Sequence, residues 1–148
     1  MARTVTAALA VFLLVSTCIA EHRFQSGPYA GFTKLEQEQV IVELPKPLHV
    51  REVSGTLLAV KGREPVRKAL FEVRDDATGK VKATKTDGEG RFRIKHLKDG
   101  KYTFKATRNG YQSVVGVLIV RAKAPESQPL SIEMPKVLSA ELAQRRVK

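Results

Sequence analysis

Between residues 50 and 134 the chain repeats one pattern, in which short apolar-alternating runs are each ended by a cluster of turn-forming residues. Arg91 to Leu97 alternates strictly (RFRIKHL), and Lys101 to Thr107 (KYTFKAT) does so again. Alternation with a period of two predicts β-strands that bury one face. Seven such runs, spaced about 8–12 residues apart, predict an all-β sandwich. The predicted strands are residues 50–60, 69–74, 81–86, 91–97, 101–107, 114–120 and 130–134.

The turn Asp87-Gly88-Glu89-Gly90 is the stretch that most resembles a functional site. Calcium takes six or more oxygen ligands, but Arg91 and Arg93 follow this turn and no further carboxylate does. Two carboxylates in an exposed turn also lack the pocket that tunes a general acid or base. Glycine accepts positive φ, and Asp accepts hydrogen bonds from nearby backbone amides. The sequence therefore predicts a structural turn.

Several stretches combine glycine turns with core positions, namely Val53 to Leu57, Glu64 to Val66, Ala69 to Val73, Thr84 to Phe92, Leu97 to Tyr102 and Asn109 to Tyr111. Together they resemble the carboxypeptidase regulatory-like domain of the transthyretin-like (prealbumin-like) β-sandwich class. The resemblance implies a seven-stranded Greek-key β-sandwich and an accessory module of exported bacterial proteins. It implies no activity, because the shared residues are turns and core positions.

The chain outside this sandwich divides into an N-terminal signal, a leader and a C-terminal tail. We expect a signal peptide at residues 1–20, a leader at 21–49, the sandwich at 50–135 and a basic tail at 136–148. Most of the leader has no steady period and is predicted to be loose. Its Val40 to Leu44 run predicts either an extra edge strand or a docked linker.

The N-terminal segment predicts export. Arg3 precedes an apolar run that ends in the small-residue stretch Cys18-Ile19-Ala20, so cleavage is expected after Ala20. Such a mature chain has no transmembrane helix and no cysteine, and acts in a periplasm or outside the cell. Lipoprotein anchoring at Cys18 is the weaker alternative, because Thr17 is a poor residue before a lipidated cysteine.

The chain is strongly basic, with 26 Lys and Arg against 15 Asp and Glu and a formal net charge of +11. A field of this sign favours anionic partners, such as acidic polysaccharide or anionic lipid. The alternative is that the charge serves only solubility. Nucleic acid is not expected as a partner, since no aromatic residues interleave the basic ones for base stacking.

The residues do not favour an enzyme. Transthyretin-like hydrolases resemble the fold but end in Tyr-Arg-Gly-Ser, which is missing here. Intradiol dioxygenases resemble it too and bind iron through two Tyr and two His, whereas His22, His49 and His96 are far apart in the sequence. His96 lies on the apolar face of its predicted strand and is interpreted as structural. No nucleophile elbow or phosphate loop is present, so we predict no catalytic activity, no cofactor and no metal.

One surface is predicted to bind a ligand. Arg91, Arg93 and Lys95 alternate along one predicted strand, and Lys101 and Lys105 along the next, so each set shares a face. If the two strands are neighbours, their outer face is a basic patch, and otherwise these residues are merely a solvated face that discourages aggregation. The predicted anionic-ligand residues are Lys80, Lys82, Arg91, Arg93, Lys95, Lys101 and Lys105.

Two functions follow as hypotheses. In the first, the protein is a binding or adhesion module of the bacterial cell envelope, and its basic face meets acidic glycan or lipid. In the second, it is a structural interaction subunit, and its leader or its Val114 to Val120 strand pairs with a partner protein by strand addition. Salt distinguishes the two, because ions screen the first interaction more strongly.

Overall fold

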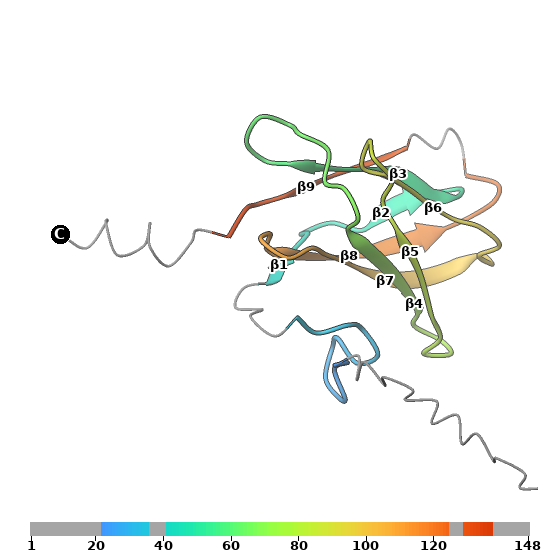
Figure 1. Cartoon of the computed structure of the whole chain (residues 1–148). Helices are drawn as coiled ribbons and strands as arrows, with labels where there is room; N and C mark the ends of the chain where they lie inside the picture. The colour runs from blue at the N-terminus through green and yellow to red at the C-terminus, as the bar shows by residue number, and fades with distance from the viewer. Residues whose placement is uncertain (1–21, 36–40, 125–128, 138–148) are drawn as a thin grey trace, which may run out of the picture.

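The computed structural model describes residues 22–35, 41–124 and 129–137, which are coloured in Figure 1. The predicted signal peptide and residues 138–148 of the predicted tail lie outside these ranges. Within the ranges the chain forms nine β-strands and no helix. The strands are β1 (Ile41–Glu43), β2 (Leu48–Val50), β3 (Val53–Ala59), β4 (Leu70–Asp75), β5 (Val81–Lys85), β6 (Arg91–Ile94), β7 (Gly100–Thr107), β8 (Ser113–Val120) and β9 (Leu130–Met134).

The strands form two sheets, and the predicted β-sandwich is confirmed. The larger sheet has the order β1-β8-β7-β4-β5, and β2 also pairs with β8. The smaller sheet has the order β6-β3-β9. Each of the seven predicted ranges overlaps a strand of the structure. The two further strands, β1 and β2, pair with β8 in parallel, so β8 has partners along both sides.

The core lies between the sheets, because alternate residues of each strand point inward. Phe71 of β4 is fully buried and stacks on Phe92 of β6, with ring centroids 4.0 Å apart. On the same sheet, Phe104 of β7 stacks on Phe71 at 5.3 Å. Stacked aromatic pairs contribute beyond the area they bury. This stack of three rings joins the larger sheet to the smaller one.

The run predicted as one strand at residues 50–60 is two strands in different sheets. β2 ends at Val50 in the larger sheet, and β3 begins at Val53 in the smaller one. Arg51 and Glu52, both exposed, form the crossing between them. Residues 50–53 read Val-Arg-Glu-Val, so the alternation shifts by one position at the crossing, and the prediction of a single strand overlooked this signal. The crossing places two charged side chains at the rim of the sandwich.

The prediction that the two basic strands are neighbours is wrong. β6 pairs with β3 in the smaller sheet, whereas β7 lies between β4 and β8 in the larger sheet. The turn Lys98-Asp99-Gly100 therefore carries the chain from one sheet to the other and does not close a hairpin. Basic residues on β6 and β7 consequently cannot form one continuous face.

The leader is not loose where the structure describes it. Residues 22–35 form a loop closed by internal backbone hydrogen bonds, such as Phe24 N to Phe32 O at 3.0 Å and Lys34 N to His22 O at 2.7 Å. In Figure 1 this loop (blue) lies against the larger sheet, on the side away from β3, β6 and β9. Phe32 is fully buried there. Residues 41–43 of the leader form β1, so the predicted extra edge strand is confirmed.

The turn at residues 87–90 is structural, as predicted. Asp87 Oδ1 accepts hydrogen bonds from the backbone amides of Glu89 and Arg91, each at 2.9 Å. Gly90 has a φ of 74°, whereas Gly88 is not in the positive-φ region. Of the two glycines, Gly90 is therefore the one whose backbone conformation favours glycine. In the described part of the chain, no helix is long and apolar enough to cross a membrane.

Candidate anionic-ligand site

The two sheets come together along β5 and β6, which are edge strands of opposite sheets. On β6, Phe92 and Ile94 point into the core, so the side chains between and after them point to solvent. Exposed basic side chains gather along both strands. We call this surface the β5–β6 seam, and it comprises Lys82, Lys85, Arg91, Arg93 and Lys95.

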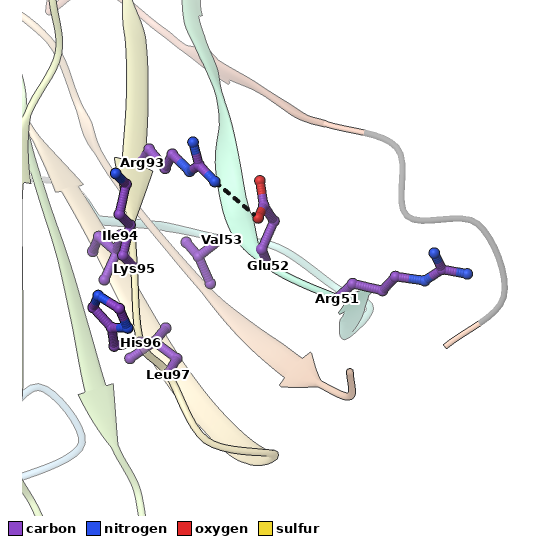
Figure 2. A pocket seen from close by; sticks show the side chains of 8 residues that line it. All are labelled: Arg51, Glu52, Val53, Arg93, Ile94, Lys95, His96 and Leu97. Carbon is purple, nitrogen blue, oxygen red and sulfur yellow. Dashed lines mark hydrogen bonds and ion pairs between the residues drawn. The ribbon is translucent and has the colours of Figure 1, made fainter. Parts of the chain in front are cut away.

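A first groove of about 300 Å³ opens between the β2–β3 crossing and the end of β6. Figure 2 shows Arg93 and Lys95 on one side of it and Glu52 on the other. Arg93 Nη2 forms an ion pair with Glu52 Oε2 at 3.3 Å, drawn as a dashed line. Arg51 extends away from this pair, and its Nε donates to the carbonyl of Ala124. The full lining is Arg51, Glu52, Val53, Arg93, Ile94, Lys95, His96 and Leu97.

A second, shallower groove of about 600 Å³ lies beside the first and shares Glu52 and Arg93 with it. It runs from the outer surface of β3 across β6 to β5. Hydroxyl groups of Ser54, Thr56 and Thr84 line it together with charged side chains. Its remaining lining residues are Gly55, Lys85, Asp87, Arg91, Phe92 and Pro129.

The two arginines of the seam form weak, exposed ion pairs. Arg91 pairs with Glu89, and their side chains are 64% and 69% exposed. Arg93 and Glu52 are 55% and 56% exposed. Exposed ion pairs contribute about 0–1 kcal/mol, because water screens the attraction. An incoming anion can therefore replace Glu52 or Glu89 at small cost.

The chemistry of the two grooves favours an anionic ligand with polar groups. They contain five cationic side chains against two acidic ones, Glu52 and Asp87. Among the lining residues of the two grooves, Phe92 is 4% exposed, so its ring is closed to a ligand, and the exposed imidazole of His96 is the one aromatic ring open at the surface. The five cations are Arg51, Lys85, Arg91, Arg93 and Lys95.

The seven predicted ligand residues divide into three groups. Lys82, Arg91, Arg93 and Lys95 come together at the seam, where Lys82 Nζ also donates to His96 O at 3.2 Å. Two exposed lysines lie elsewhere, Lys80 in the β4–β5 turn and Lys101 on the outer face of the larger sheet. Lys105 is completely buried, so its assignment to an exposed patch is wrong.

Two cations of the grooves were missed. Lys85 is three residues after Lys82, so strict alternation assigned it to the opposite face, yet it lines the second groove beside β6. Arg51 lies at the crossing between sheets, where the break in the alternation at Arg51 and Glu52 was overlooked. The prediction for His96 is also wrong. β6 ends at Ile94, and His96 is exposed with a φ of 63°.

Within residues 22–35, 41–124 and 129–137, no three His, Cys, Asp or Glu side chains gather as metal ligands would. A crystal structure of 3-chlorocatechol 1,2-dioxygenase from Rhodococcus opacus 1CP aligns with a TM-score of 0.44 and 15% identity, over 74% of this chain and 71% of that one. Similarity at this level carries no inference about activity. Curated proteins gave no match.

A family model settles the relationship. The model of the carboxypeptidase regulatory-like domain matches residues 52–135, which is more than half of the chain. Its span begins at the β2–β3 crossing and ends one residue after β9, so it contains both sheets' central strands. Domains of this family are commonly non-catalytic modules. The chain belongs to the carboxypeptidase regulatory-like domain family.

Proposed function

We propose that this protein is a non-catalytic binding module that holds an acidic polysaccharide along the β5–β6 seam. The proposal rests on the two adjoining grooves, which are lined by five cationic residues. The acidic partners of Arg91 and Arg93 are exposed and bind these arginines weakly. Carboxylate or sulfate groups along a glycan would pair with Arg91 and Arg93, where arginine's planar guanidinium supports two parallel hydrogen bonds.

A chain-like ligand fits the surface better than a membrane or a nucleic acid does. The two grooves adjoin and share Arg93, so one extended polymer could contact both. Adsorption to lipid benefits from exposed apolar side chains, but among the described residues the large exposed ones are Val60 and Val137, which line neither groove. Single-stranded nucleic acid would be expected to stack successive bases on several aromatic rings, whereas the grooves expose one such ring, the imidazole of His96.

The proposed place of action is the cell envelope or the medium outside it. This location depends on the predicted signal peptide at residues 1–20. The hydroxyl groups of Ser54, Thr56 and Thr84 support a sugar ligand, since they can exchange hydrogen bonds with glycan hydroxyls along the same groove.

The test is binding of the mature chain to a panel of acidic and neutral polysaccharides at low and high salt. The seam variant carries Arg91→Ser, Arg93→Ser and Lys95→Ser. The matched control carries Lys61→Ser, Lys101→Ser and Lys123→Ser, which removes the same charge from exposed positions outside both grooves. We expect binding to an acidic glycan that weakens as salt screens the charges, is lost in the seam variant and is kept by the control.

Equal weakening of both variants would contradict the proposal, because it would mean that net charge alone attracts the glycan. Binding to anionic vesicles but not to any acidic polysaccharide would replace the proposed ligand with a lipid surface. Circular dichroism of each variant would verify that the sandwich is intact.

A further inference from the structure

A second candidate site lies on the opposite side of the molecule, on the outer face of the larger sheet beneath the leader. Glu72 of β4 and Lys105 of β7 stand directly opposite each other in the antiparallel register. Both point away from the core, yet Glu72 is 2% exposed and Lys105 is fully buried. Charged residues are almost never buried unless they are paired, so their surroundings require an explanation.

These two side chains bind the main chain of one leader residue, Thr33, one through its amide and the other through its carbonyl oxygen. The backbone amide of Thr33 donates to Glu72 Oε1 at 3.0 Å. Lys105 Nζ donates to the carbonyl oxygen of Thr33 at 2.6 Å. Both contacts are to main-chain atoms and would form with almost any residue at position 33. Hydrogen bonds with one charged partner are stronger than neutral ones.

Arg74, two residues after Glu72 on β4, holds the turn of the leader in the same way. Its Nη1 donates to the carbonyl of Pro28 at 3.0 Å and to that of Ala30 at 2.8 Å. Its guanidinium carbon also lies 5.0 Å from the ring centroid of Phe32, which is completely buried. The charged group therefore contacts both the backbone and an aromatic side chain of the leader.

The leader contributes a second aromatic contact. Lys105 Nζ lies 4.7 Å from the ring centroid of Phe24, a distance at which a cation is attracted to the ring face. Phe24 and Tyr29 also pack edge to face, with centroids 5.7 Å apart. The site thus combines main-chain hydrogen bonds with cation–π contacts to two phenylalanines of one short loop.

We propose that Glu72, Lys105 and Arg74 form a peptide-binding site on the outer face of the larger sheet, and that residues 22–35 are its ligand, held in cis but separable. The ligand class is a short peptide with a glycine turn between two aromatic residues, recognised through its main chain. This site uses the larger sheet and a peptide, so it does not depend on the polysaccharide site of the seam.

Two observations support a separable ligand rather than a fixed part of the core. The loop satisfies part of its own backbone through the bonds between residues 22–24 and 31–34, so it is a unit in itself. The surface beneath it carries charged groups, which water would solvate if the loop left. A surface that stays permanently covered would be more stable if it were apolar, because burying charges costs several kcal/mol per ion.

The experiment starts from the whole mature chain with a protease recognition sequence inserted after Leu35. After cleavage, size-exclusion chromatography shows whether the leader fragment stays with the sandwich. A fluorescent synthetic peptide of residues 22–35 is then added and its binding followed by anisotropy. We expect the cleaved fragment to co-elute and the labelled peptide to replace it saturably at one copy per chain.

Specificity is tested on the peptide, which leaves the protein unchanged. N-methylation of Thr33 in the peptide removes the N–H that Glu72 accepts, and we expect binding at least about tenfold weaker. On the protein, Lys105→Met should abolish peptide binding, whereas Lys101→Met, an exposed lysine of the same strand, should not.

Two results would overturn the proposal. In the first, the fragment dissociates on cleavage and the labelled peptide fails to bind at about 1 mM, which corresponds to a free energy weaker than about −4 kcal/mol. In the second, the N-methylated peptide binds as well as the unmodified one, which would mean that the main-chain contacts do not contribute to binding.

Discussion

Glu72 and Lys105 face each other across two neighbouring strands on the outer side of a sheet, and both are buried because the leader covers them. Both also bind the main chain of Thr33, Glu72 by accepting from its amide and Lys105 by donating to its carbonyl oxygen. The larger sheet is therefore covered on both faces, by the smaller sheet on one side and by the leader on the other. Substituting either member of this pair should therefore destabilise the protein more than other substitutions on the outer face.

Removing one member of this pair should destabilise the protein strongly. Lys105→Met keeps most of the length of the side chain but removes one of the two cations, Lys105 and Arg23, that attract the buried carboxyl group of Glu72. We expect the free energy of unfolding to fall by about 3 kcal/mol, as for other broken buried pairs. Urea denaturation measures this change. Lys101→Met, the exposed control, should stay within about 0.5 kcal/mol of the wild type. A Lys105→Met protein as stable as the wild type would contradict the role of the pair.

Replacing both members should restore much of the loss. The double variant Glu72→Leu/Lys105→Met removes both desolvated charges and buries apolar side chains in their place. Such replacements are often neutral or stabilising. We expect the double variant to be more stable than Lys105→Met alone in the same urea titration. If it is less stable than that single variant, the cost lies in lost packing and not in the unpaired carboxylate.

The pH dependence of stability should carry the signature of Glu72. Burial raises the pKa of this carboxyl above its ordinary value of 4.5, and the hydrogen bonds from Thr33 and the attraction of Lys105 only partly offset the effect. The folded protein therefore binds this proton more tightly than the unfolded chain does. The stabilisation is fully present below pH 4.5 and is lost as the pH rises through the raised pKa.

Glu72→Gln provides the comparison, because the amide cannot titrate. Urea denaturation of both proteins at a series of pH values gives the difference between their free energies of unfolding. This difference, wild type minus variant, should fall as the pH rises from 4.5. A difference that stays constant or increases over this window would contradict a raised pKa for Glu72.

The strands of this sandwich could be predicted from the sequence because alternation is a local property. In RFRIKHL, each apolar residue identifies the buried face without any knowledge of the partner strand, and Phe92 and Ile94 are indeed buried. Pairing is not local. A three-residue turn after Leu97 is compatible with a hairpin or with a crossing between sheets, and the same pattern fits both. The prediction of one basic face across both strands was wrong for this reason.

The peptide site could not be predicted by the same reasoning. Alternation in KYTFKAT correctly directs Lys105 away from the core, but burial then depends on a cover from more than 70 positions earlier in the sequence. The signal available was the aromatic content of the leader, Phe24, Tyr29 and Phe32 around a Gly-Pro turn. Aromatic residues in such a leader favour docking, yet without periodicity they do not indicate which surface is covered.

The turn at residues 87–90 offers a matched pair of glycine substitutions. Gly90 has a φ of 74°, and a Cβ there would lie 2.6 Å from the carbonyl oxygen of Leu57. We expect Gly90→Ala to lower the free energy of unfolding by at least about 2 kcal/mol, from backbone strain and the clash together. Gly88 has no positive φ and open space around it, so Gly88→Ala should be close to neutral. Thermal and urea denaturation measure both variants, and equal losses in the free energy of unfolding for Gly88→Ala and Gly90→Ala would contradict this account.

Tyr102 gives a prediction for alkaline conditions. Its side chain is 4% exposed, and its hydroxyl donates to the carbonyl of Lys98 at 2.7 Å. Burial raises the pKa of this phenol above 10.0, and the negative charge of Asp75 acts in the same direction. The folded state therefore keeps the Tyr102 proton when an exposed phenol would lose it.

An ultraviolet titration should detect this phenol among the three tyrosines of the chain. The wild type should show one ionisation above pH 10 that is missing in Tyr102→Phe. The contribution of Tyr102 to stability is complete below pH 10.0 and is lost as the pH rises through its raised pKa. At neutral pH the variant should be less stable by about 1 kcal/mol, because the carbonyl of Lys98 loses its donor. If the ionisation that is lost in Tyr102→Phe falls at or below pH 10.0, Tyr102 ionises like an exposed phenol, and the hydrogen bond to Lys98 would then not hold it in the core.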